Sequence, residues 1–166
     1  MRSTGNPLVP MIICFGLISC GPAQITQESI RKSDRYYQAA YIAWHDSGDN
    51  LAAIRHLTRA VEANPNNADA HYLLGTLRLG RQEYEEAEPH LKKAVKFREG
   101  NPSKQVEAQN SLGVLYINTE RYEKAVEVLT LASKEVLNSA PWLAYGNLGM
   151  AYTELGMYDE AEAALK

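Results

Sequence analysis

Small and apolar residues recur along this chain in a register that is the same in four segments. A first row of small or aromatic residues is followed 12 residues later by alanine and four residues after that by leucine. Three of the four segments then have another alanine three residues further on. The rows are Tyr41, Gly75, Gly113, Gly149; Ala53, Ala87, Ala125, Ala161; Leu57, Leu91, Leu129, Leu165; and Ala60, Ala94, Ala132. This repetition predicts stacked helical hairpins whose small residues allow close contact and whose leucines fill the space between helices.

Turn signals divide each of these segments into two helices. They are SGDN, GRQE, NTER and LGMY at 47–50, 80–83, 118–121 and 155–158. Pro65, within NPNN, ends a helix between the first and second segments. The resulting domain, 34–166, divides into repeats at 34–67, 68–101, 106–139 and 142–166. We expect the fourth repeat to be incomplete and further repeats to follow Lys166.

The register resembles the tetratricopeptide repeat. That motif has a Leu-Gly pair, a tyrosine three residues later, then alanine, a large apolar residue, alanine and a final proline. The first repeat departs from it with Tyr41 and Trp44, and the second with Arg78. The resemblance implies an all-α fold, a right-handed superhelix or solenoid of antiparallel helix pairs.

The N-terminal region has the features of an export signal. Apolar residues from Leu8 to Ser19 follow a single basic residue, Arg2, and are too few to span a membrane. They end in Leu17-Ile18-Ser19-Cys20, which resembles a bacterial lipobox. We therefore expect a lipoprotein signal peptide at 1–19 and a lipidated N-terminus and linker at 20–33, with the acyl chains on Cys20. An ordinary cleaved signal and a buried hydrophobic cysteine are the alternatives.

Charge and motif spacing give no indication of catalysis. The formal net charge of -3 is unlike the basic stripe of a nucleic-acid-binding protein. The four histidines lack the one-turn spacing of a helical zinc motif, and each is interpreted as a surface or core-edge residue. Ser19 and Ser47 have no histidine and aspartate partners in motif spacing, and no glycine-rich phosphate loop follows a strand, since no convincing strand is present. We expect no enzyme activity, cofactor, metal, nucleic acid or small-molecule substrate.

Binding is the function that this fold class favours, because stacked hairpins present a concave surface lined by the first helix of each repeat. By resemblance to other tetratricopeptide domains, the second, fifth, ninth and twelfth residues of each repeat face this groove. The mixed polarity of these positions suits an apolar peptide or helix. An alternative is that some of them pack against a missing capping segment. The predicted partner-binding residues are Gln38, Ile42, Tyr72, Thr76, Leu79, Asn110, Val114, Ile117, Leu143 and Met150.

The order of lipobox, short linker and repeats resembles the pilotins of type IV pilus biogenesis, the PilF, PilW or Tgl type. The stretch VLNSAPWLAYGNLGMAYTELGMYDEA, Val136 to Ala161, is similar to a repeat junction of that family. Gly21 after the cysteine resembles the outer-membrane sorting pattern. The resemblance implies a protein anchored in the outer membrane, with repeats facing the periplasm, that binds secretin subunits and promotes their assembly. The alternative is a lipid-anchored periplasmic adaptor for peptidoglycan or envelope assembly proteins.

Overall fold

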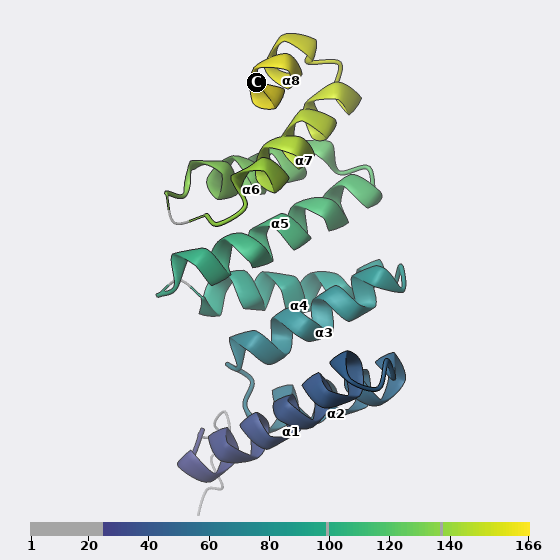
Figure 1. Ribbon diagram of the computed structural model, residues 1–166, viewed down its shortest axis with the longest axis vertical. Helices are drawn as coiled ribbons and strands as arrows, with labels where there is room; N and C mark the ends of the chain where they lie inside the picture. The colour runs from purple at the N-terminus through teal and green to yellow at the C-terminus, as the bar shows by residue number, and fades with distance from the viewer. Residues whose placement is uncertain (1–24, 99, 137) are drawn as a thin grey trace, which may run out of the picture.

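The structure, a computed structural model, describes residues 25–98, 100–136 and 138–166. This part of the chain forms eight helices and no strand. They stack as four antiparallel pairs into an elongated solenoid (Figure 1). The helices are α1 (Gln27–His45), α2 (Asn50–Ala63), α3 (Ala68–Gly80), α4 (Tyr84–Phe97), α5 (Pro102–Asn118), α6 (Tyr122–Lys134), α7 (Pro141–Glu154) and α8 (Tyr158–Leu165). The expected all-α solenoid is confirmed.

The first helix begins earlier than the sequence register predicts. Residues up to 33 were expected to be a linker, but α1 starts at Gln27, where Thr26 and Ser29 form a capping box. Ser33 is fully buried, and its hydroxyl donates a hydrogen bond to the carbonyl of Ala60 at 2.8 Å. The expectation of a linker is therefore wrong for the last residues of that range, because the capping box begins the helix earlier and the Ser33–Ala60 hydrogen bond holds it against α2. Cys20 and the signal peptide lie outside the described residues.

Close contact within each pair depends on the glycines of the repeat. A Cβ added to Gly75, Gly113 or Gly149 would lie 2.5–2.7 Å from the side chain of the leucine 16 residues later. Two of these leucines, Leu91 and Leu129, are fully buried. The predicted role of the glycines as close-contact positions is confirmed, since any side chain there would force the two helices apart.

The turn inside each pair contains a left-handed residue at the same repeat position. Gly48 and Gly156 have φ of 65° and 73°, and Gln82 and Glu120 have φ of 62° and 57°. Left-handed backbone costs a residue with a Cβ about 1–2 kcal/mol, so the second and third repeats carry strain that the first and fourth avoid. The strain persists because hydrogen bonds hold the turns, for example from Glu83 N–H to the carbonyl of Arg78 at 3.0 Å.

The buried core divides into two main parts along the solenoid. One gathers residues of α1, α2 and α3 around Leu57 and Leu74. The other runs from α4 to α7 around Leu91, Leu115 and Leu129. The core therefore extends along the solenoid from α1 to α7.

Candidate functional site: the concave groove

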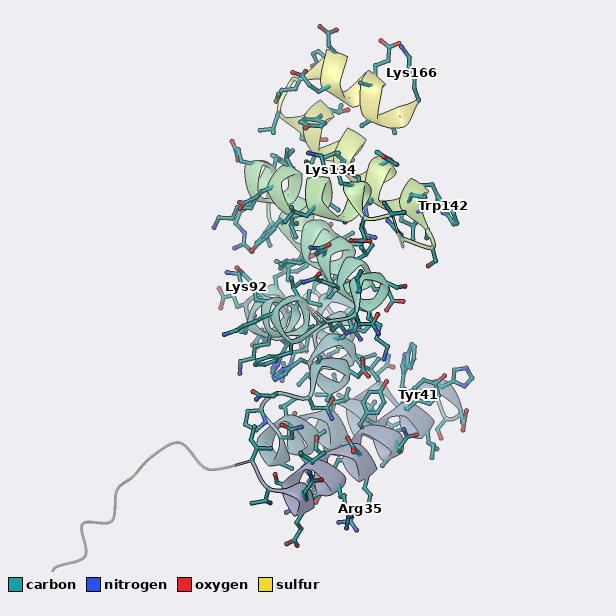
Figure 2. All side chains as sticks on the ribbon, turned by 90° about the vertical axis from the view of Figure 1, so that its left-hand side faces the viewer. Arg35, Tyr41, Lys92, Lys134, Trp142 and Lys166 are labelled. Carbon is teal, nitrogen blue, oxygen red and sulfur yellow. The ribbon has the colours of Figure 1, made fainter. Side chains whose placement is uncertain are left out.

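The first helices of the repeats line one side of the solenoid. Figure 2 shows Tyr41 of α1 and Trp142 of α7 projecting from that side and Lys92 of α4 projecting from the other. Two adjoining cavities lie along it. We call the one between α3, α5 and α7 the asparagine cavity and the one between α1, α3 and α5 the aromatic cavity.

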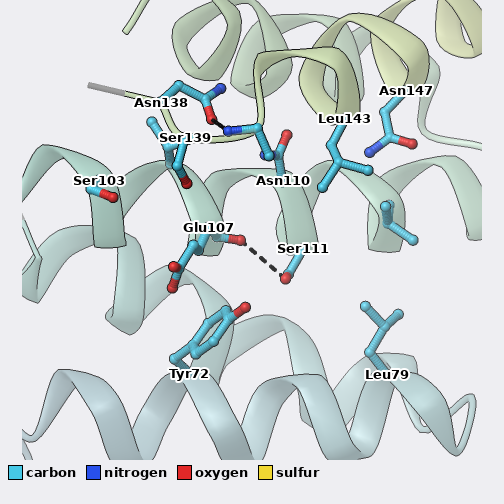
Figure 3. A pocket seen from close by; sticks show the side chains of 13 residues that line it. Tyr72, Leu79, Ser103, Glu107, Asn110, Ser111, Asn138, Ser139, Leu143 and Asn147 are labelled. Carbon is cyan, nitrogen blue, oxygen red and sulfur yellow. Dashed lines mark hydrogen bonds between the residues drawn. The ribbon is translucent and has the colours of Figure 1, made fainter. Parts of the chain in front are cut away.

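The asparagine cavity has a volume of about 450 Å³ and combines apolar side chains with amides. Figure 3 shows Tyr72 and Leu79 from α3 on one side of it and Asn110, Leu143 and Asn147 on the other. The buried Oδ1 of Asn110 accepts no hydrogen bond from any described residue. A buried carbonyl without a donor costs about 1–3 kcal/mol, so Asn110 is an uncompensated polar residue in the wall of this cavity. Its lining is Tyr72, Leu79, Ser103, Val106, Glu107, Asn110, Ser111, Val114, Asn138, Ser139, Ala140, Leu143 and Asn147.

The segment between α6 and α7 forms one rim of this cavity and is held by an asparagine. Asn138 donates from Nδ2 to the carbonyl of Ala132 at 3.1 Å, and its Oδ1 accepts from the Ala140 N–H at 2.9 Å. Pro141 then occupies the first turn of α7. The segment between α6 and α7 thus supplies a wall of the cavity through Asn138, Ser139 and Ala140.

The aromatic cavity has a volume of about 380 Å³ and lies beside an ionic cluster. Arg98 is only 5% exposed; its Nη2 lies 2.7 Å from Asp69 Oδ1, and its guanidinium carbon lies 4.2 Å from the Tyr72 ring centre. Lys104 Nζ lies 2.9 Å from the other Asp69 oxygen, and Arg98 Nη1 lies 3.5 Å from Glu107 Oε2. Although burial raises the pKa of Asp69, hydrogen bonds from Lys104 and Arg98 lower it more. The cluster contains two cations and two carboxylates.

The predicted groove residues are only partly brought together. Tyr72, Leu79, Asn110, Val114 and Leu143 line the asparagine cavity, and Tyr72 and Thr76 line the aromatic cavity.

Four further predicted residues lie outside both cavities. Gln38, Ile42 and Met150 are exposed, and Ile117 is half-buried against the core around α5. Tyr72 and Leu79 also pack against that core, although their side chains were expected to point away from it. A partner in these cavities would therefore contact residues that also support the fold.

A histidine pair between α3 and α4 was missed by the sequence interpretation. The Nδ1 atoms of His71 and His90 lie 2.8 Å apart, and His71 Nε2 lies 2.9 Å from the carbonyl of Pro65. Because that carbonyl requires an N–H, His71 Nδ1 is left to accept from His90 Nδ1–H. Burial lowers both pKa values, and that of His90 reaches about 4, because the positive charges of Arg78 and Lys93, and of His71 when it is protonated, lower it further. Both rings are therefore neutral at pH 7.

His71 and His90 are 19 residues apart and lie on different helices, so spacing rules for a single helix do not predict their contact. His71 is a buried residue, not the surface or core-edge residue that the sequence interpretation assigned. Within the ranges described, no group of three histidine, cysteine, aspartate or glutamate side chains is arranged to hold a metal ion. No helix there has the length and hydropathy needed to cross a membrane.

Known structures share this arrangement at low sequence identity. A crystal structure of MamA has a TM-score of 0.70 and 24% identity, with 80% of this chain and 74% of MamA covered. Pseudomonas aeruginosa PilF has a TM-score of 0.68 and 24% identity, with 83% of this chain and 60% of PilF covered. The apo form of RapI has a TM-score of 0.71 and 15% identity, with 84% and 42% covered. These likenesses show the fold.

The sequence itself matches models of one family. Two models described as tetratricopeptide repeat match residues 37–103 and residues 106–134 and 143–166, which together make up well over half of the chain. A comparison with curated proteins finds no match. The chain belongs to the tetratricopeptide-repeat family, whose stacked hairpins serve as scaffolds for protein–protein interaction.

Proposed function

We propose that this protein is a lipid-anchored pilotin that binds secretin subunits of a type IV pilus and promotes their assembly in the outer membrane. The observation that carries the binding role is the asparagine cavity, a recess of about 450 Å³ lined by apolar side chains and amides. Such a recess suits a polypeptide segment, which brings apolar side chains and backbone N–H groups together. The choice of partner rests on the resemblance of the lipobox, the linker and the repeats to the pilotins, and the likeness in fold to PilF is consistent with it.

The anchor rests on the lipobox at Leu17 to Cys20. α1 begins at Gln27, so the stretch between the acylated cysteine and the first helix reaches at most about 20–25 Å when extended. Several acyl chains on one cysteine hold a protein durably at a membrane. The tether thus keeps the groove near the inner face of the outer membrane and raises the local concentration of bound secretin subunits there. Catalysis has no part in this role.

The proposal is tested by removing the anchor and the protein separately. Deleting the gene is expected to abolish heat-stable secretin multimers, and Cys20→Ser is expected to release the protein from the membrane fraction and reduce multimers in the outer membrane. Secretin immunoblots after membrane fractionation measure both. Normal multimers in the deletion strain would contradict the pilotin role and favour the periplasmic adaptor. Labelled fatty acid on the Cys20→Ser variant would contradict the anchor.

A further inference from the structure

The aromatic cavity presents four aromatic side chains to one recess. Tyr37, Tyr41 and Trp44 come from α1, and Tyr72 comes from α3. The rings of Tyr41 and Trp44 pack edge to face with centroids 5.9 Å apart, and the Tyr41 ring also stacks on His45 at 5.3 Å. Tyr41 and Trp44 are 40% and 38% exposed, so this preorganised aromatic surface remains accessible.

The charges beside these rings are already compensated. Asp69 is paired with Arg98 and Lys104, and Glu107 lies 3.5 Å from Arg98. An acidic or a basic occupant would have to compete with these pairs. An uncharged segment therefore matches the electrostatics of this cavity best.

The aromatic side chains also carry unused hydrogen-bond donors. Within the described ranges, the hydroxyls of Tyr37, Tyr41 and Tyr72 and the indole N–H of Trp44 donate to no protein atom. Burial and the nearby Asp69 carboxylate raise the pKa of Tyr37, so that hydroxyl keeps its proton. The cavity thus offers ring faces and N–H or O–H donors, which suit an occupant with apolar rings and free acceptors.

A polyproline II segment has those features. Its pyrrolidine rings are uncharged and pack on aromatic faces, and its backbone carbonyls have no internal hydrogen bonds and accept from donors in the groove. The preformed helix also loses little conformational entropy on binding. We propose that the aromatic cavity binds a proline-rich segment of the partner in the polyproline II conformation. This inference rests on the proposed binding role of the concave groove and names the chemistry of what it binds.

The two cavities adjoin, and Tyr72 and Glu107 line both. A segment whose prolines lie on Tyr41 and Trp44 would extend past Tyr72 toward the asparagine cavity. An apolar residue there contacts Leu79 and Leu143. The expected partner motif is a short proline run next to an apolar residue.

Tryptophan fluorescence tests the proposal directly. The chain has two tryptophans, so Trp142→Phe leaves Trp44 as the sole reporter, at the wall of the aromatic cavity. The full chain in detergent micelles is titrated with a decaproline peptide and with a glycine-serine peptide of equal length. Decaproline is expected to change the Trp44 emission saturably, and the glycine-serine peptide is not. No saturable change, or equal binding of both peptides, would overturn the proposal.

A matched pair of tyrosine variants locates the site. In the Trp142→Phe chain, Tyr41→Ala is expected to weaken decaproline binding about tenfold or more, since an aromatic contact contributes about 1.4 kcal/mol. Tyr145→Ala removes a ring of similar exposure, 42%, at the far end of the solenoid and is expected to bind normally. Equal affinity of the two variants would overturn the assignment. Secretin assembly that depends on the protein, with no decaproline binding, would overturn this inference and leave the proposed function standing.

Discussion

Replacing Gly113 by alanine tests the close helix contact that defines the repeats. The new methyl carbon would lie 2.5 Å from both Cγ and Cδ2 of Leu129 and 3.0 Å from its Cδ1. Leu129 is fully buried, so its side chain has no free space into which to move. α5 and α6 must therefore separate to accept the methyl group.

The expected magnitude follows from two opposing terms. Alanine favours a helix over glycine by about 1 kcal/mol, and overpacking a tight core costs about 1–3 kcal/mol. Three carbons within 3.0 Å put Gly113→Ala near the upper end of the overpacking range, so we expect a net loss of about 2 kcal/mol. Gly146→Ala is the matched control, because Gly146 also lies inside a helix and its added Cβ meets nothing within 4 Å. It is expected to stabilise the protein by up to about 1 kcal/mol.

Thermal unfolding followed by circular dichroism at 222 nm measures both variants. At about 3 °C for each kcal/mol in a chain of this size, Gly113→Ala is expected to lower Tm by about 6 °C and Gly146→Ala to raise it by about 2–3 °C. Both variants make the same glycine-to-alanine change, so Tm shifts of opposite sign separate the effect of packing from that of helix propensity. A Tm for Gly113→Ala equal to or above that of the unsubstituted chain would refute the close-contact account.

Three further changes probe the turn, the histidine pair and the groove. Gly156→Ala is expected to cost about 1 kcal/mol, since its φ of 73° strains any residue with a Cβ; an unchanged Tm would count against this. The folded-state pKa values of His71 and His90 are lowered, so the free energy of unfolding is highest above about pH 6.5 and falls as the pH drops toward 4. Protonation of His90 accounts for at most about 3 kcal/mol of this loss. Denaturant midpoints across this window measure the loss, and a His90→Phe variant with an equally steep pH dependence would contradict it. Asn110→Ala removes an amide that lines the asparagine cavity and is expected to weaken partner binding about tenfold. It is not expected to lower Tm, because the buried carbonyl that it removes has no donor. An unchanged affinity in calorimetry would exclude Asn110 from the site.

The repeat register predicted the helix pairs because each close contact needs a small residue at a fixed position. Gly75 and Gly113 meet leucines from the neighbouring helix at the same separation in the sequence. The left-handed turns at Gln82 and Glu120 were harder to foresee, since neither residue type favours that conformation. The sequence indicated these turns only in that both residues occupy the same position in the repeat as Gly48.

Interactions between helices were beyond the reach of spacing rules. The His71–His90 contact joins two helices, and the ionic cluster around Arg98 joins the end of α4 to α3 and α5. Ile42 and Met150 were predicted from their positions in the repeat, but both are exposed and line neither cavity. The cavities form where neighbouring repeats meet and beside the segment between α6 and α7. The repeat pattern in the sequence thus indicated which side of the solenoid is concave. The positions of the two cavities depend on packing between repeats, which the pattern does not describe.

The claim that the concave groove binds secretin is tested most directly by two leucine variants. Leu143 lines the asparagine cavity and is 53% exposed, whereas Leu131 is 59% exposed and lies beside Lys92, on the other side of the solenoid. Because both side chains are largely in solvent, Leu143→Asp and Leu131→Asp are expected to fold and fractionate alike. Heat-stable secretin multimers in cells are the measurement. The account predicts that Leu143→Asp abolishes them and Leu131→Asp leaves them intact; multimers that are normal with Leu143→Asp, or lost equally with both variants, would contradict it.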